Sequence, residues 1–316
     1  MEIEPLIKCS TFLSDSFSSS GVRVITGKFN RDTDNNKDYD DYDDKRNSFH
    51  DKQRAEDDNN FTIIVTGAGV INAAHGLTVY LERCIKNNKN LIIIQTGIAG
   101  VFEGSGLKIG DVAVASSDTY IHTGVGFNKA GVSSIDSVKY SDLKIASEKN
   151  LSYCYPLNPL PFELVHNCPE SKSGKFIFDK ELIKRACSNI KESLVKEATS
   201  RRKDITSRIE DKTCNAAIGD FITVSTITAA PEHVDHLFKA FNRPCMESME
   251  GAASAHIAKL YNIGFIQVRA GSNLVGERDK DKWNVPLACE RACFAVKSII
   301  ENGALFVESL NPNQSC

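Results

Sequence analysis

The chain has 316 residues, of which 41% are hydrophobic and 25% charged, a normal globular balance with enough apolar material for a buried core. Its formal net charge of -3 gives no global attraction to nucleic acid or anionic membranes, and no apolar run is long enough to span a bilayer. The acidic start also lacks the basic-then-apolar pattern of a secretory signal. These features predict a soluble, cytoplasmic protein that binds neither nucleic acid nor membranes.

The ten cysteines and seven histidines do not form a recognisable metal or disulfide pattern. No C-x-x-C pair occurs, and Cys289 and Cys293, one helical turn apart, have no second pair at zinc-ligand spacing. His233 and His236 could share a helix face, but the acidic residues beside them favour a solvated surface. The sequence therefore predicts reduced thiols, no bound metal and no cofactor.

The first distinctive segment in chain order is strongly acidic. Asn30–Asn60 holds eleven acidic and six basic residues and hardly any aliphatic side chain. Such a composition cannot offset the entropy lost on ordering, so it predicts a disordered surface insertion. An acidic interaction tail is the alternative interpretation.

After this segment, short apolar runs alternate with helical patterns. A strand is predicted at 61–65, followed by a glycine-containing turn and a helix at 71–84. The aliphatic run at 91–94 is typical of a central strand covered on both faces, and a glycine turn follows it at 95–100. The remaining predictions are strands at 110–115, 221–225 and 264–269, helices at 250–260 and 289–302, and a polar loop at about 191–215 that could include the end of a charged helix. This alternation predicts an α/β domain built on a largely parallel sheet.

The glycine-rich turn after the first of these strands has the beginning of a dinucleotide-binding pattern. Gly67 and Gly69 form G-x-G, but the third glycine position holds Asn72. The next strand ends at Gln95, where an acidic residue would be needed to hold a ribose. Small residues in this turn therefore indicate local geometry rather than a bound dinucleotide.

Three other segments indicate a ligand site: Gln95–Gly100, Met246–Ala253 and Val268–Asn273. Each adjoins a predicted strand or helix end, where open α/β sheets place their ligands. Taken alone, Glu250 could be an ordinary acidic residue of a helix start, and Asn273 an ordinary turn residue.

Taken together, the segments resemble the nucleoside phosphorylase and nucleosidase superfamily and, within it, the futalosine hydrolases. The resemblance runs from about Phe61 to Glu301 and is carried by TGAGVINAAHG, QTGIAGVFEGSGLKIGDVAVA, YPLNPLPFEL, TVSTIT, MEGAASAHIA and VRAGSNLVGERDKDKW. It implies one nucleosidase domain over residues 1–316 with a three-layer α/β fold, in which helices flank a mixed, partly barrel-like sheet. It also implies a homo-oligomer in which a neighbouring subunit contributes to the edge of the active site.

The activity that the resemblance implies is hydrolysis of an N-glycosidic bond, releasing hypoxanthine and dehypoxanthine futalosine from futalosine in menaquinone biosynthesis. Phosphorylases of the superfamily place an Arg and a Ser or Thr where this chain has Gln95 and Ile98, which cannot neutralise a phosphate dianion. Three alternatives stay open: another purine nucleosidase acting on inosine-like nucleosides or on methylthioadenosine and S-adenosylhomocysteine, a phosphorylase, and a non-catalytic nucleoside-binding relative.

The resemblance also implies roles for individual residues. Glu250 would accept hydrogen bonds from the ribose hydroxyls and favour the oxocarbenium-like transition state, and Met249 would pack against the sugar. Asn273 would face the base: an amide can donate to a 6-oxo group and accept from a protonated N-7, which suits hypoxanthine or guanine. Phe221 would stack on the base, or would simply be a core strand aromatic. The further substrate-binding residues are Gly97, Ile98, Ala99 and Ser272.

The sequence departs from the family at its start. Family members open with an apolar strand that leads to a Glu activating the attacking water, and Met1–Ile7 resembles the sequence just after that strand. Either the strand lies upstream of this Met1 or the domain lacks it, and the first is favoured because losing a central strand would expose apolar surface on its neighbours. Alignment makes Glu2 the candidate water-activating residue and Glu4 the second choice, although both could be polar residues of a helix start.

Overall fold

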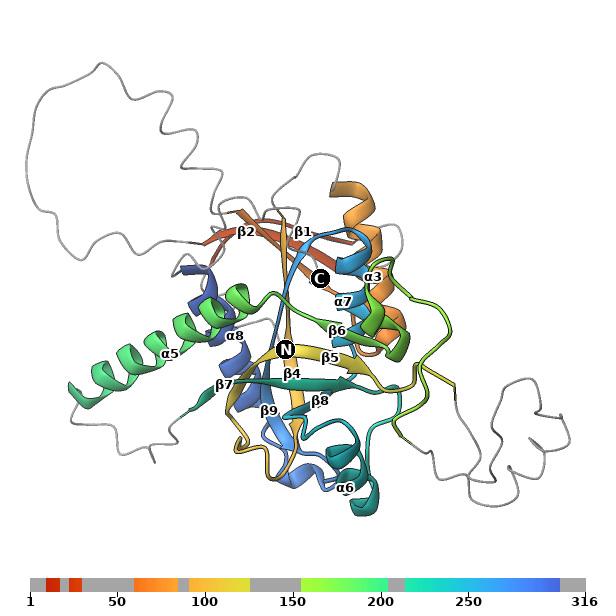
Figure 1. Cartoon of the computed structure of the whole chain (residues 1–316). Coiled ribbons are helices and arrows are strands. Elements are labelled where there is room, and N and C mark those ends of the chain that lie inside the picture. Colours follow the sequence, from red (N-terminus) through yellow and green to blue (C-terminus); the bar gives the residue numbers. More distant parts are fainter. Residues whose placement is uncertain are drawn as a thin grey trace, which may run out of the picture.

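The computed structural model describes residues 10–17, 23–29, 60–84, 91–125, 155–203 and 214–301, which contain two β-sheets and the helices around them (Figure 1). The smaller sheet is antiparallel and has the order β1 (Ser10–Phe17), β2 (Arg23–Phe29) and β3 (Asn60–Val65). The strand predicted at 61–65 is thus confirmed and begins one residue earlier.

The predicted acidic insertion connects β2 to β3. Lys28 of β2 pairs with Asn60 of β3, so the connection leaves and re-enters the sheet at adjacent positions. Residues 30–59, on which the prediction of disorder rests, lie outside the described residues.

The larger sheet has the strand order β6-β5-β7-β8-β4-β9, and β9 pairs in addition with β5. The strands are β4 (Ile92–Val101), β5 (Val112–Tyr120), β6 (Lys175–Ile177), β7 (Ala216–Thr223), β8 (Met246–Ser248) and β9 (Gly264–Leu274). Because Val112 of β5 pairs with Ala270 of β9, the strands β5, β7, β8, β4 and β9 close into a ring.

The ring mixes parallel and antiparallel pairs. Pairs β4–β9, β5–β7 and β7–β8 are parallel, whereas β4–β8, β5–β9 and the attached β5–β6 are antiparallel. The partly barrel-like, mixed sheet is confirmed. The sheet is also largely parallel, as expected, because the long pairings β4–β9 and β5–β7 are parallel and the antiparallel pairings are short. The antiparallel contacts come from the short strands β6 and β8 and from ring closure, which periodicity along one strand does not reveal.

Helices cover the ring on both sides, which gives three layers. Helices α5 and α8 pack together on one side, and α3 and α7 pack together on the other (Figure 1). The five described α-helices are α3 (Val70–Cys84), α5 (Lys180–Lys203), α6 (Pro231–Ala240), α7 (Gly251–Leu260) and α8 (Val285–Glu301), with short 3-10 turns at Pro169–Ser173 and Lys280–Lys282. The predicted helices at 71–84 and 250–260 are confirmed to within one residue, and the helix predicted from 289 begins at Val285.

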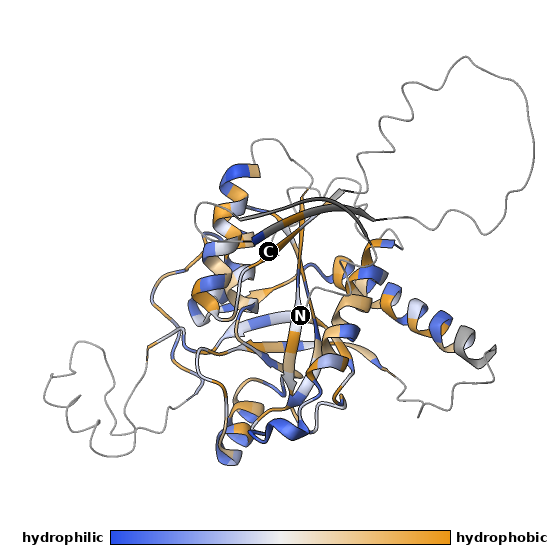
Figure 2. Ribbon diagram, turned by 180° about the vertical axis from the view of Figure 1, so that it is seen from behind, coloured by the Kyte–Doolittle hydropathy of each residue, from blue (hydrophilic) through white to orange (hydrophobic). Residues whose placement is uncertain are grey.

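The polar stretch at about 191–215 begins with the end of a charged helix, as the sequence allows. Helix α5 continues to Lys203, while residues 204–213 lie outside the described residues. The buried Cys187 and Ile190 fix its first turns against the sheet, and the Lys and Glu residues that follow are good helix formers. The helices carry apolar and polar sides, as the alternating colours of Figure 2 show. No helix of the described residues is both long and apolar enough to cross a membrane.

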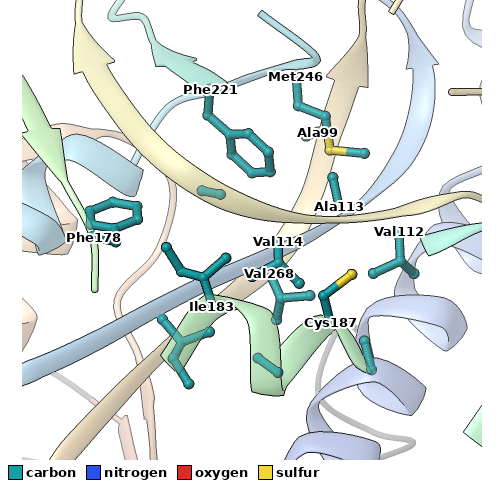
Figure 3. Packing of buried hydrophobic residues seen from close by; sticks show 14 of the residues in the cluster. Ala99, Val112, Ala113, Val114, Phe178, Ile183, Cys187, Phe221, Met246 and Val268 are labelled. Atoms are coloured by element: carbon teal, nitrogen blue, oxygen red, sulfur yellow. The ribbon is translucent and has the colours of Figure 1, made fainter. Parts of the chain in front are cut away.

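Two apolar clusters support the ring. The main core contains Val112–Ala115 of β5, each 0% exposed, and brings Phe221, Met246 and Ala99 together from three strands (Figure 3). A second group, here called the side cluster, packs α6 against the ring. It consists of Phe102, Ile121, Tyr155, Ile222, Val224, Leu237 and Val275. Cys289 and Cys293, for which the sequence favours no metal site, are both buried on α8.

Candidate active site

Glu250 stands between β8 and α7, at the N-cap position of the helix. Its side chain does not cap its own helix but is held by two other elements. Oε1 accepts a 2.9 Å hydrogen bond from the backbone N–H of Gly69, in the turn between β3 and α3. Oε2 forms a 3.0 Å ion pair with Nη2 of Arg269 on β9. The carboxylate is therefore fixed from two directions, while 13% of its side chain remains exposed.

Arg269 reaches Glu250 by crossing β4 at a glycine. Its Nη1 donates to the carbonyl of Ile98 at 3.3 Å, and a Cβ added at Gly97 would lie 2.6 Å from Nη1. Only glycine leaves room for the guanidinium there. The glycine turn predicted at 95–100 is wrong: the segment belongs to β4, because its pairing with β9 continues to Val101 with one irregularity between Ala99 and Gly100.

Asn273 lies within β9, not in a turn after it, and pairs with Gly100 of β4. Its amide is oriented by two neighbours. Oδ1 lies 2.7 Å from Ser272 Oγ, which is also 3.2 Å from the carbonyl of Ala99, and Nδ2 donates to the carbonyl of Leu274 at 2.8 Å. These bonds leave one lone pair on Oδ1 and one hydrogen on Nδ2. Asn273 can therefore still offer one acceptor and one donor.

A family model described as the phosphorylase superfamily matches residues 57–301. The chain belongs to the phosphorylase superfamily. Solved structures with the same fold include 5'-methylthioadenosine/S-adenosylhomocysteine nucleosidases. The enzyme from Colwellia psychrerythraea, in complex with adenine, is 18% identical with a TM-score of 0.61, over 96% of this chain and 91% of that chain. The enzyme from Neisseria meningitidis, in complex with methylthio-immucillin-A, is 17% identical with a TM-score of 0.57, over 95% and 94%.

The chain is also similar to futalosine hydrolases. The structure of the Helicobacter pylori enzyme is 13% identical with a TM-score of 0.55, over 95% of this chain and 94% of that chain. At such identities these structures show the common fold. Futalosine hydrolase of Acidothermus cellulolyticus is 35% identical over 74 residues, which are 23% of this chain and 30% of that relative's length.

The other predicted site residues of this protein lie in different surroundings. Met249 packs against the side cluster, next to Glu250. Phe221 is 1% exposed and packs in the main core with Ala99, and its stacking on the base stays a prediction (Figure 3). Glu2 and Glu4, the candidates for water activation, lie outside the described residues.

Sequence reasoning missed a buried acid next to Glu250 and Arg269. Asp118 of β5 is 0% exposed, and its Oδ1 accepts a 2.8 Å hydrogen bond from Thr223 Oγ1. Burial raises the pKa of Asp118 to about 6, although Thr223, Gln267 and the charge of Arg269 act in the opposite direction. The available signal was a polar run, Ser116–Thr119, directly after four buried apolar residues of the strand.

A second buried acid was also missed. Glu247 of β8 accepts from the backbone N–H of Thr228 at 3.1 Å and from its hydroxyl at 2.5 Å. Burial raises the pKa of Glu247, while Thr228 and the charge of Arg278 lower it. Glu247 thereby ties the segment after β7 to the strand that leads to Glu250.

Proposed function

We propose that this protein hydrolyses the N-glycosidic bond of a 6-oxopurine nucleoside, with futalosine as the substrate. The observation that carries the proposal is the oriented amide of Asn273, which presents one acceptor and one donor. A 6-oxopurine leaving with a proton on N-7 offers the complementary pair. Adenine presents a 6-amino donor instead, and a mismatched buried pair costs about 1–3 kcal/mol.

The proposed reaction is a substitution at the anomeric carbon. The bond from that carbon to the purine nitrogen breaks, its electrons leave with the base, and water adds its oxygen to the sugar. Positive charge grows on the sugar during this step, and the partly exposed carboxylate of Glu250 would stabilise it. Asn273 Oδ1 would accept a hydrogen bond from the protonated N-7, and Nδ2 would donate one to O-6. Solvent supplies the proton on N-7, and the attacking water gives its proton to the water-activating carboxylate. Glu2 remains our candidate for activating the water, with Glu4 second.

Water is the proposed nucleophile because the corresponding strand offers no phosphate ligand. Gln95 and Ile98 of β4 stand where phosphorylases of the superfamily place their anion-binding residues, and neither is basic. The similarity to futalosine hydrolases supports futalosine over simpler nucleosides, whereas the likeness to methylthioadenosine nucleosidases keeps that activity as the second candidate.

We extend the proposal to a homo-oligomer. Ile71 is 80% exposed at the start of α3, two residues after Gly69, whose N–H binds Glu250. A large aliphatic side chain so close to the site is suited to contact with a second copy of the chain. Sedimentation of the wild type and of Ile71→Asp tests this, and a monomeric wild type would contradict it.

The test of function measures free base released from futalosine, inosine and methylthioadenosine, each with and without phosphate. We expect hypoxanthine from futalosine at a rate that phosphate does not change. Adenine from methylthioadenosine without any hypoxanthine would replace the proposal by the second candidate. A requirement for phosphate would indicate a phosphorylase, and binding without any release a non-catalytic relative.

A further inference from the structure

Asp118 lies directly beneath the first turn of α7, the helix at whose N-cap position Glu250 stands. A Cβ added at Gly251 would be 2.1 Å from Asp118 Oδ2 and 2.1 Å from Gln267 Nε2. The backbone of the helix start therefore rests on the carboxylate itself. Within the described residues, neither Asp118 Oδ2 nor the side-chain amide of Gln267 forms a hydrogen bond of ordinary geometry.

A hydroxyl relay connects Asp118 to the helix. Thr223 Oγ1 donates to Asp118 Oδ1 at 2.8 Å and accepts from the backbone N–H of Ala252 at 2.9 Å. Because a hydroxyl has one hydrogen, its donation to Asp118 turns a lone pair towards Ala252. Asp118 thus sets the orientation in which Thr223 satisfies an otherwise unpaired N–H in the first turn of α7.

Three charges meet at this point of the ring. Arg269 pairs with Glu250 at 3.0 Å, and its positive charge also acts on Asp118. The other groups facing Asp118 are Gln267 beside it, Thr223 on β7 and the thiol of Cys245, whose pKa burial raises so that it stays neutral. With Asp118 ionised the three charged groups sum to one negative charge, and with Asp118 protonated they sum to zero.

We propose that Asp118 is a positioning residue that orders the first turn of α7 through Thr223 and offsets the charge of Arg269, so that Glu250 presents an uncompensated negative charge to the sugar. This inference rests on the proposed function, in which a cationic sugar develops beside Glu250. Asp118 itself touches no substrate atom in this scheme, since it is fully buried.

The proposal predicts a pH dependence in the working range of the protein. The pKa of Asp118 is about 6, so the carboxylate is charged above that pH and neutral below it. Turnover should therefore fall as the pH drops through about 6. Stability should depend on pH in the opposite direction. Because the pKa of Asp118 is higher in the folded than in the unfolded chain, the free energy of unfolding decreases as the pH rises from the pKa of the unfolded chain towards 6.

The test compares wild type with Asp118→Asn, which keeps an oxygen for Thr223 and removes the charge. We expect kcat for futalosine at pH 8 to fall about tenfold with KM changed little, because the charge acts on the cationic transition state. The acid limb near pH 6 should disappear. The melting temperature at pH 8 should stay level or rise, since a buried charge is lost; a merely structural residue would lose stability instead.

Asp111→Asn is the matched control. This carboxylate is also buried, at the other end of β5, and accepts 2.8 Å bonds from the backbone N–H groups of Lys108 and Asn215. It should lower the melting temperature and leave the pH profile of kcat unchanged. For the relay, Thr223→Val should reduce kcat whereas Thr223→Ser should retain it.

Two results overturn the inference. An active wild type whose kcat and acid limb are unchanged in Asp118→Asn removes Asp118 from the site and leaves the proposed function intact. A wild type that releases no base from futalosine, inosine or methylthioadenosine overturns the proposed function and this inference with it.

Discussion

Glu250 is the residue on which the proposed chemistry depends most. Glu250→Gln keeps an oxygen for the N–H of Gly69 but loses the charge opposite Arg269. We expect kcat to fall by about 10²–10³ because one well-placed electrostatic partner of the transition state is lost. Steady-state release of hypoxanthine measures this, with circular dichroism to show that the variant folds.

The control for this prediction is Glu232→Gln, in the exposed first turn of α6, which should leave kcat unchanged. If Glu250→Gln keeps activity within a few-fold of wild type, Glu250 has no role in the mechanism.

Asn273 should decide which base is released. Asn273→Asp retains an oxygen for Ser272 but replaces the donor that faces the carbonyl of Leu274. An ionised carboxylate repels both that carbonyl and O-6, and a protonated one donates to N-7 while accepting from a 6-amino group. We expect the ratio of kcat/KM for a 6-oxopurine nucleoside to its 6-amino analogue to fall by about 10–10³-fold.

Measuring both analogues with wild type and variant at neutral pH gives this ratio. Ser272→Ala is a milder companion, since it removes one orienting bond and leaves the amide in place. An unchanged ratio in Asn273→Asp would show that the amide does not touch the base.

At the scale of elements, the contact between α7 and the ring allows no side chain at Gly251. In Gly251→Ala the new Cβ would overlap Asp118 Oδ2 and Gln267 Nε2, so these two buried side chains or the helix must shift. Overpacking of this kind typically costs about 1–3 kcal/mol. We expect a lower free energy of unfolding in urea and a loss of activity, because Glu250 moves with the helix.

Gly106→Ala provides the comparison. A Cβ there meets nothing within 4 Å, and only the positive φ of 85° is unfavourable. A loss of stability in Gly251→Ala no greater than in Gly106→Ala would contradict the close contact at α7.

Elements with a complete local pattern could be predicted from the sequence. Helix α3 has its apolar period, and β3 and the start of β4 are short aliphatic runs between polar segments. Glycines within β4 and β9 misled the prediction, because Gly97 and Gly271 signal turns locally but serve close packing inside strands: added Cβ atoms would meet Arg269 and Val101. Strand β8 has only three residues, too few for a sequence pattern, and is defined by its pairing with β4 and β7.

In the site, too, some residues could be predicted from the local sequence and others could not. Glu250 and Asn273 could be chosen from family motifs, because each lies in a distinctive short string. The position of Asp118 beneath α7 could not, since it depends on the pairing of β5 with β7, which brings Thr223 between Asp118 and the start of α7. Contacts across a closed ring leave no regular trace in the local sequence.

At the scale of the whole molecule, the acidic connection between β2 and β3 should be dispensable. Because Lys28 and Asn60 are paired, a short Gly-Asn turn in place of residues 31–58 can join the strands without moving them. We expect the melting temperature and kcat to stay nearly unchanged. A control deletion of 27–61 removes paired strand residues and should lower the melting temperature. If removing 31–58 alone lowers either quantity strongly, the segment contributes to the fold or the site.

The closure of the ring also governs the order in which the chain can fold during its synthesis. Strand β5 pairs with β7 and β9, and β4 with β8 and β9, so every one of these partners is made later than the strand that needs it. When the ribosome has synthesised the chain only as far as β8, β4 is present without its parallel neighbour β9. The apolar edges of β4 and β5 must then remain soluble until Leu274 emerges, and a prematurely terminated chain exposes edges suited to aggregation.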